Sequence, residues 1–155
     1  MTTAKTGFDG RPRIGFGLIG LGLMGREMAC AIARYCQLLD DGPVPELVAV
    51  CDSNPSALDW FRRNFGERVA CVNDFQDLLR VKGVDAVYCA VPHRLHESLY
   101  GAVIAAGKHL LGEKPFGIDA AANRAILAAI ARHPDRIVRC SSEFPYFPAA
   151  RRLVE

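Results

Sequence analysis

The feature that most constrains the fold is the segment from Arg13 to Gly25, which reads RIGFGLIGLGLMG. An apolar run leads directly into glycines with the spacing GxGxxG, and a segment compatible with a helix follows from Arg26. This order predicts a strand, a glycine turn and a helix, the unit that binds the pyrophosphate of a dinucleotide. In that unit Gly20 permits the tight turn, Gly22 lets the backbone approach the pyrophosphate, and Gly25 lets the helix pack against the strand. The start of the helix adds unpaired N–H groups and a positive dipole end.

Because GxGxxG also occurs by chance, the next strand along the chain is needed to support this interpretation. A second apolar run, Glu46 to Cys51, stops at Asp52. In a dinucleotide fold, an acid at this place accepts hydrogen bonds from the adenosine ribose hydroxyls, and its charge repels a 2′-phosphate. Asp52 lies further along the chain than the roughly 20 residues usual after the glycines, and a lengthened loop at residues 40–45 explains the delay. The alternative for Asp52 is a helix N-cap before Ser53, which is compatible with ribose binding.

Composition narrows the class of protein. The chain has 155 residues, 50% of them hydrophobic, and a net charge of +2 that is too small and too dispersed to indicate a nucleic-acid partner. Its six cysteines show no CxxC spacing, which favours free thiols in a reducing cytosol over disulfides or a metal site. The polar N-terminus does not resemble a signal peptide, and no apolar run reaches the roughly 20 residues of a membrane span. We therefore expect a cytoplasmic protein of one domain without a membrane partner.

The rest of the chain alternates predicted strands with predicted helices. This indicates an α/β fold, a Rossmann-type doubly wound parallel sheet with helices on both faces. We expect a flexible leader at residues 1–12, the sheet domain at 13–145 and the start of a helix at 146–155. The main expected strands are 14–19, 46–51, 69–72, 84–91, 108–112 and 136–142, and the main expected helices are 26–39, 95–106 and 119–133. Ligands of such sheets bind beyond the carboxyl ends of the strands, so the glycine turn, Asp52, Pro92-His93 and Glu113-Lys114 should converge on one crevice.

Lys114 and His96 are the side chains at this edge that could take part in chemistry. A lysine at a strand end, beside a bound nicotinamide, can stabilise a developing alkoxide or orient a hydroxyl. A surface lysine next to a turn proline is an equally good interpretation, and a cis Lys114–Pro115 bond is possible. We place His96 one turn inside a helix, facing the crevice, where it could bind cofactor or substrate. A plain histidine at a helix start is the alternative.

Four segments together resemble a known family. They read GLIGLGLMG, VAVCD, VDAVYCAVPHRLH and AAGKHLLGEKPFGIDAAANRAIL. They are similar to the N-terminal half of the Gfo/Idh/MocA oxidoreductases, the family of glucose-fructose oxidoreductase and inositol dehydrogenase, from about Arg13 to the end of the chain. The resemblance implies a nicotinamide-dependent oxidoreductase acting on sugars, polyols or their derivatives. It also implies that Lys114 is the catalytic-site lysine, that Glu113 and His96 line the nicotinamide end, and that Asp52 selects the ribose.

The chain departs from the family pattern in two respects. Members are usually more than twice as long and carry a C-terminal α/β domain that covers the active site, so residues 146–155 would begin the linker helix to an absent substrate domain. The segment from Cys140 to Ala149 also lacks the arginine that many members carry there. We therefore expect the chain to bind cofactor with little turnover and the complete enzyme to transfer hydride. A homo-oligomer formed through the missing domain is an open option.

The expected cofactor is NAD, since no arginine directly follows Ser53 to bind a 2′-phosphate, with NADP possible. No metal is expected, and Lys114 and His96 are the expected catalytic residues. The residues expected to contact the cofactor are Gly20, Gly22, Leu23, Met24, Gly25, Asp52, Ser53, Ala90, Val91, Pro92, His93, His96, Glu113 and Lys114. Two other functions stay open: a non-catalytic NAD-binding sensor or partner subunit, and an S-adenosylmethionine methyltransferase, which would leave Glu113-Lys114-Pro115 unexplained.

Overall fold

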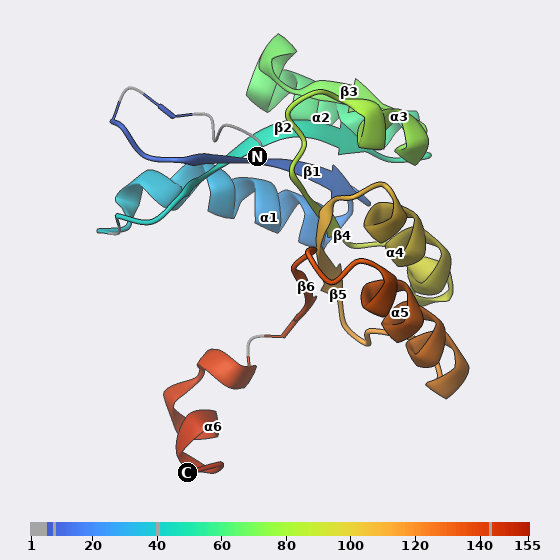
Figure 1. Ribbon diagram of the computed structural model, residues 1–155. Coiled ribbons are helices and arrows are strands. Elements are labelled where there is room, and N and C mark those ends of the chain that lie inside the picture. Colours follow the sequence, from blue (N-terminus) through green and yellow to red (C-terminus); the bar gives the residue numbers. More distant parts are fainter. Residues whose placement is uncertain (1–5, 8, 40, 143) are drawn as a thin grey trace.

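A twisted parallel sheet forms the centre of the computed structural model, which describes residues 6–7, 9–39, 41–142 and 144–155 (Figure 1). The six strands of this described part lie in the order β3-β2-β1-β4-β5-β6, and every neighbouring pair is parallel. The strands are β1 (Arg13–Ile19), β2 (Val44–Cys51), β3 (Ala70–Val72), β4 (Ala86–Cys89), β5 (His109–Glu113) and β6 (Val138–Ser141). This confirms the predicted doubly wound parallel sheet.

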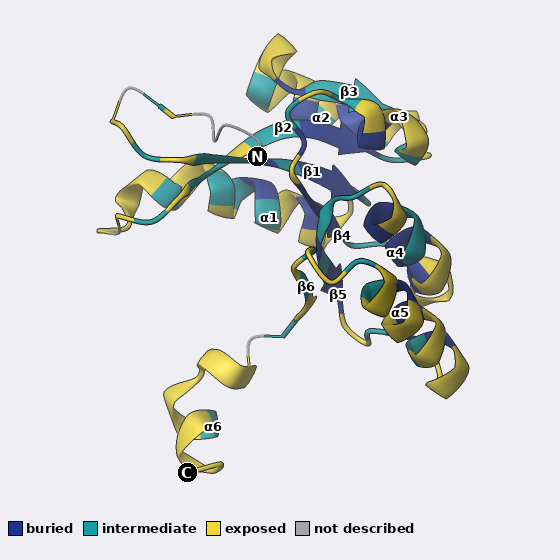
Figure 2. Ribbon diagram, in the orientation of Figure 1, coloured by how far each residue is buried: buried dark blue, intermediate teal, exposed yellow. Residues whose placement is uncertain are grey.

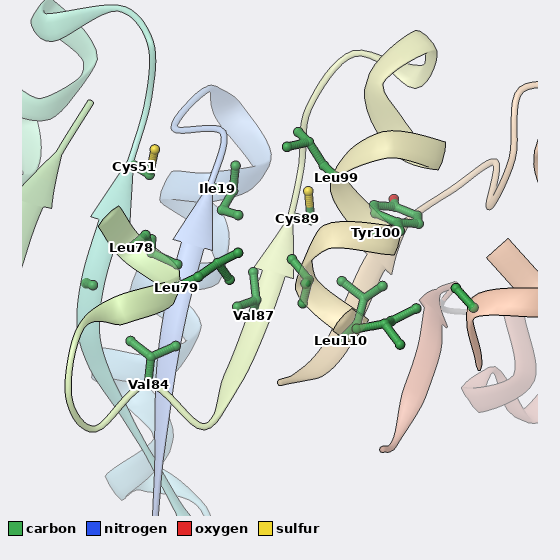
Figure 3. Close-up of a cluster of buried hydrophobic side chains, with 14 of the residues drawn as sticks. Ile19, Cys51, Leu78, Leu79, Val84, Val87, Cys89, Leu99, Tyr100 and Leu110 are labelled. Carbon is green, nitrogen blue, oxygen red and sulfur yellow. The ribbon is translucent and has the colours of Figure 1, made fainter. Parts of the chain in front are cut away.

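Helices cover both faces of the sheet, as predicted. They are α1 (Leu23–Arg34), α2 (Pro55–Phe65), α3 (Phe75–Arg80), α4 (His96–Ala105) and α5 (Ala120–Arg132), whereas α6 (Pro148–Arg152) lies outside these layers (Figure 1). Successive strand residues point to opposite faces, and in β1 Leu18 packs in the cluster formed with α1 and α2, whereas Ile19 packs in the cluster formed with α3, α4 and α5 (Figure 3). Burial on both faces is the reason that the strands read as continuous apolar runs, and the exposed residues lie on the outer sides of the helices (Figure 2).

The carboxyl ends of the central strands lie side by side. Ile19 at the end of β1 pairs with Cys51 on one side and with Cys89 on the other. Cys89 in turn pairs with Gly112, one residue before the end of β5. Strands β2 and β3 are added on one side of β1 and strands β4 to β6 on its other side, which makes this point the switch point of the sheet. The loops predicted to converge are therefore neighbours.

Several boundaries differ from the sequence predictions. Helix α1 begins at Leu23 rather than Arg26, because Gly22 takes the N-cap position inside the glycine turn, and it ends at Arg34 before a short 3-10 turn. Strand β2 begins at Val44, whose N–H donates to the carbonyl of Pro12, so the expected loop 40–45 is shorter than predicted. Strand β4 covers residues 86–89 only, not 84–91.

The segments before β1 and after β6 flank the sheet domain. Residues 1–5 and Phe8 of the expected leader are outside the described residues, and the guanidinium group of Arg11 donates to the carbonyl of Gly42 at 2.6 and 3.0 Å. Helix α6 starts at Pro148, within the segment predicted to begin a helix, and extends away from the sheet (Figure 1). None of the helices in the described ranges is long and apolar enough to cross a membrane.

Candidate functional site

The glycine turn brings the start of α1 tightly against β1. Gly20 has a φ of 89°, and a Cβ atom built on it would lie 2.2 Å from the carbonyl oxygen of Ala90. A Cβ atom on Gly25 would lie 2.2 Å from the carbonyl oxygen of Gly20, so both positions require glycine. Gly22 differs, because a Cβ atom there would meet nothing within 4 Å. The three glycines thus occupy the positions that the sequence predicts: one makes the turn, one admits the helix, and one leaves the backbone bare on the open side.

Among the described residues, no side chain caps the N-terminus of α1. Its N-cap, Gly22, supplies no side-chain hydrogen bond, and no acidic residue lies in the first turn. The first N–H groups of a helix lack intrahelical acceptors, and the helix dipole favours an anion beside them. This end of α1 therefore fits the diphosphate of a dinucleotide.

Asp52 is fixed against the same turn. Its Oδ2 atom accepts a hydrogen bond from the Leu21 N–H at 2.8 Å, and its Oδ1 atom accepts one from the Asn54 N–H at 2.9 Å. The interpretation of Asp52 as a helix cap is wrong, because Asn54 caps α2 by accepting a hydrogen bond from the Ser56 N–H at 3.1 Å. A carboxylate oxygen can accept more than one hydrogen bond. The half-buried Asp52 carboxylate can therefore still receive two ribose hydroxyls.

A cavity of about 580 Å³ lies at this edge of the sheet, within the size range of small-molecule sites. Asp52 and Asn73 contribute polar groups to it, and Phe75 and Leu99 contribute apolar walls. The predicted contacts that line it are Gly20, Gly22, Asp52, Ser53, Ala90, Val91 and Pro92. The lining residues that sequence reasoning missed are Ile19, Cys51, Asn73, Phe75, Leu95, Ser98 and Leu99.

The other predicted contacts do not line this cavity. Leu23, Met24 and Gly25 lie in the first turn of α1. His93 and His96 lie beyond the end of β4, Glu113 is the last residue of β5, and Lys114 follows it. Asn73 follows β3 directly, and Leu95 and Leu99 flank the start of α4. The rule that ligands bind at carboxyl ends of strands could have included these three residues, since each belongs to a segment that follows such an end.

Cys51 forms part of the cavity wall. Burial, with a smaller contribution from the neighbouring Asp52 charge, raises the pKa of its thiol to about 12. It is therefore a neutral, apolar wall residue near neutral pH. All six cysteines are free thiols, as the sequence predicts, and the described part of the chain holds no group of three or more side chains suited to a metal ion.

Lys114 is exposed and directly follows β5. The Lys114–Pro115 bond is cis. No ion pair involving Lys114 occurs within the described ranges. Lys114 thus follows the strand that neighbours β4, and the loop after β4 lines the cavity. Within the described ranges it is a cation without an ion pair at the same edge of the sheet as Asp52.

The expected orientation of His96 toward the crevice is wrong. His96 is the first residue of α4, not one turn inside it, and its side chain is fully buried. Its Nδ1 atom lies 2.8 Å from the carbonyl oxygen of Pro115, and its Nε2 atom lies 3.0 Å from the carbonyl oxygen of Val91. The ring therefore joins the loop after β4 to the loop after β5 and has no nitrogen left for a ligand. The exposed ring of His93 packs edge-on against it, with centroids 5.3 Å apart.

Glu113 is also buried rather than open to the crevice. The Tyr88 hydroxyl donates to its Oε1 atom at 2.6 Å, and its Oε2 atom accepts from the Lys114 N–H at 3.1 Å. The Tyr100 hydroxyl, reaching over from α4, donates to the Glu113 carbonyl oxygen at 2.9 Å. Burial, reinforced by Glu113, raises the pKa of Tyr88 well above its usual value, so Tyr88 is a hydrogen-bond donor at neutral pH.

Comparison with known proteins agrees with this geometry. Residues 14–140 match the Gfo/Idh/MocA family, described as an oxidoreductase family with an NAD-binding Rossmann fold. The inositol 2-dehydrogenase of Rhizobium meliloti (strain 1021) is 28% identical over 142 residues, which cover 90% of this chain and 40% of that protein. The dTDP-3,4-didehydro-2,6-dideoxy-alpha-D-glucose 3-reductase of Saccharopolyspora spinosa is 30% identical over 115 residues, which cover 72% of this chain and 34% of that protein.

The fold of the chain is also similar to that of a solved structure. The scyllo-inositol dehydrogenase of Lactobacillus casei, crystallised with NAD(H) and scyllo-inositol, matches with a TM-score of 0.79 and 28% identity over 92% of this chain and 41% of the other. The matched part of the chain thus covers 34–41% of the length of these relatives. Since the family match spans residues 14–140, the chain belongs to the Gfo/Idh/MocA oxidoreductases and contains the NAD-binding Rossmann fold of that family.

Proposed function

We propose that the whole protein is a dehydrogenase that transfers a hydride between a nicotinamide cofactor and a carbinol carbon of a sugar, polyol or related hydroxy compound. The observation that carries the proposal is that two charged side chains follow strands at the same edge of the sheet. The Asp52 carboxylate lines the cavity and is fixed on the glycine turn, and the exposed Lys114 follows β5, next to the strand whose loop lines that cavity. Relatives named as inositol dehydrogenases and a ketosugar reductase support the substrate class.

The proposed cofactor contacts follow the cavity from one end to the other. The first turn of α1, with Gly22, Leu23 and Met24, would hold the diphosphate through backbone N–H groups. Asp52 and Ser53 would hold the adenosine ribose, and the apolar walls at Phe75 and Leu99 would hold the adenine. The loop 90–93 would lead toward the nicotinamide. When bound, the nicotinamide ring supplies the hydride acceptor or donor of the reaction.

Lys114 is the proposed catalytic residue. Its ammonium group has no ion-pair partner within the described residues and can therefore donate to the oxygen on the reacting carbon. Donation to that oxygen stabilises the negative charge that grows on it as hydride leaves or arrives. His96 holds the two loops beside Lys114 and does not contact the substrate in this proposal. Residues outside this chain would complete the substrate site, since the relatives are more than twice as long.

Asp52 also determines the proposed choice between the two nicotinamide cofactors. Its carboxylate would repel a 2′-phosphate, and the next residue in the cavity wall, Ser53, carries no positive charge to offset this. We therefore propose NAD as the preferred cofactor. The free state of the six cysteines supports the further proposal of a reducing, cytoplasmic location.

Titration of the chain with NADH, NADPH and S-adenosylmethionine tests the proposal. NADH should bind, NADPH should bind at least about tenfold more weakly, and S-adenosylmethionine should not compete. Asp52→Asn should remove the preference for NADH, whereas Asp59→Asn, which changes an exposed carboxylate on α2, should leave it intact. Equal binding of the two nicotinamide cofactors by the unmodified chain would contradict the proposed role of Asp52.

A further inference from the structure

Glu113 is a buried charge without an ionic partner. Its residue is 7% exposed, and none of the ion pairs found among the described residues includes it. A buried carboxylate without a cation is costly unless hydrogen bonds satisfy it. The two oxygens of this one are satisfied by the Tyr88 hydroxyl and by the Lys114 N–H. The fold thus buries a carboxylate, which costs free energy, in hydrogen-bond contact with the main chain of the proposed catalytic lysine.

Tyr88 reaches this carboxylate from the neighbouring strand. It is 3% exposed, and its ring packs in the cluster under α1 and α2, where the other strand side chains, such as Leu18 and Val50, are aliphatic. A phenylalanine would fill the same space, so the hydroxyl is what the position adds. Its bond to Glu113, 2.6 Å long, has the length of an O–H donor on an ionised acceptor.

The segment on the other side of Lys114 is held as well. The His96 ring contacts the carbonyl oxygen of Pro115 and stacks on Tyr100, with centroids 4.6 Å apart. Tyr100 in turn donates to the main chain of Glu113. The residues before and after Lys114 are therefore tied to β4 and α4, while the Lys114 side chain stays exposed and unpaired within the described structure. Sites that must present one group accurately are held by such supporting side chains.

We propose that Tyr88 is a positioning residue for Lys114: its hydroxyl fixes the Glu113 carboxylate, and that carboxylate holds the Lys114 main chain in place. The catalytic meaning of this hold rests on the proposed function. The hold itself does not, because it is a property of the chain without ligand. Tyr88→Phe removes only the hydroxyl that donates to Oε1 of Glu113. The carboxylate is then free to rotate, and its Oε2 atom can move away from the Lys114 N–H.

Amide hydrogen exchange, measured by NMR on the chain without cofactor, tests the hold. In Tyr88→Phe the Lys114 amide should exchange about tenfold faster relative to core amides such as that of Leu18, the change expected when one buried hydrogen bond opens. The control Ile126→Val trims a buried side chain of α5 and should change Lys114 no more than the core amides. Glu113→Gln should keep the protection, since its amide group can donate to Tyr88 and accept from Lys114. If Tyr88→Phe does not fold alone, the same comparison is made in the Glu113→Gln background, which carries no buried charge.

Binding of NADH and ADP-ribose gives the second measurement, because only NADH carries the nicotinamide. Tyr88→Phe should weaken NADH at least about threefold and leave ADP-ribose unchanged. The inference would be overturned if Tyr88→Phe accelerated exchange of the Lys114 amide no more than exchange of the core amides. It would also be overturned if Tyr88→Phe weakened NADH and ADP-ribose equally. If the unmodified chain bound neither ligand, the proposed function would fail, and the exchange measurement would still decide whether Tyr88 holds Lys114.

Discussion

Replacing Gly25 by alanine tests whether the close approach of α1 to the glycine turn holds the site together. A Cβ atom here would lie 2.2 Å from the Gly20 carbonyl oxygen, although packed Cβ atoms keep at least 3.0 Å. The helix must therefore withdraw by about 0.8 Å or more, and overpacking of this kind costs about 1–3 kcal/mol. The clash is with main chain, which cannot rotate away, so we expect the upper end of this range. Alanine favours a helix over glycine by about 1 kcal/mol, which leaves a net loss of about 2 kcal/mol.

Urea unfolding followed by fluorescence of the single tryptophan, Trp60, measures this loss. In a chain of this length a loss of 2 kcal/mol corresponds to a Tm about 4–8 °C lower. Gly22→Ala is the matched control, because a Cβ atom at Gly22 meets no atom within 4 Å. Its free energy of unfolding should change by less than about 1 kcal/mol, whereas NADH should bind at least about tenfold more weakly because the methyl group covers the bare backbone. A Gly25→Ala variant as stable as the unmodified chain would refute the reasoning.

Three further predictions follow from the same geometry. Asp52→Asn should lower the free energy of unfolding by about 2 kcal/mol. The carboxylate accepts hydrogen bonds from two N–H groups, and the side-chain nitrogen of asparagine must face one of them. Thermal unfolding, with Asp59→Asn as the control, checks this. Lys114→Met should leave ADP-ribose binding by the chain within about threefold and reduce kcat of the whole protein by at least about a hundredfold; steady-state kinetics and titration together decide, and an unchanged kcat would remove Lys114 from the mechanism. The third prediction concerns His109, whose Nδ1 atom accepts the Ile137 N–H at 2.9 Å and whose pKa is lowered by burial and by Arg136. Its contribution to stability is therefore present above its ordinary pKa of 6.5 and is lost as pH falls below that value. The free energy of unfolding should therefore fall between about pH 8 and about pH 5.5, and it should fall further in the unmodified chain than in His109→Gln.

The parts of the site that sequence could predict are those fixed by local pattern. Gly20 and Gly25 stand where only glycine fits, and Asp52 follows a strand whose apolar run ends one residue before it. The parallel direction of the strands then follows from the alternation of strands and helices. The start of α1 was predicted three residues late, because Leu23 and Met24 look like turn residues until Gly22 is recognised as the N-cap.

The orientation of His96 could not be predicted in this way. A 3-10 turn at residues 93–95 precedes α4, and the helix therefore begins at His96 rather than before it. Successive side chains of a helix differ in direction by about 100°. An error of one residue in the helix start is therefore enough to predict a side chain in the crevice when it lies in the interior. The cavity walls at Phe75 and Leu99 depend in the same way on how α3 and α4 pack against the sheet.

The two ends of the site are built differently, and this affects how mutations in it should be interpreted. At the Asp52 end, the contacts are hydrogen bonds from neighbouring main chain to one half-buried side chain. At the Lys114 end, buried side chains of β4 and α4 hold a loop that follows β5, and removing one partner of a buried hydrogen bond costs about 1–3 kcal/mol. A substitution at Tyr88 or His96 therefore changes stability and the placement of Lys114 together, so an activity loss there is interpretable only beside a control of equal stability. At Lys114 itself, exposed and outside every ion pair of the described structure, an activity loss can be assigned to the side chain directly.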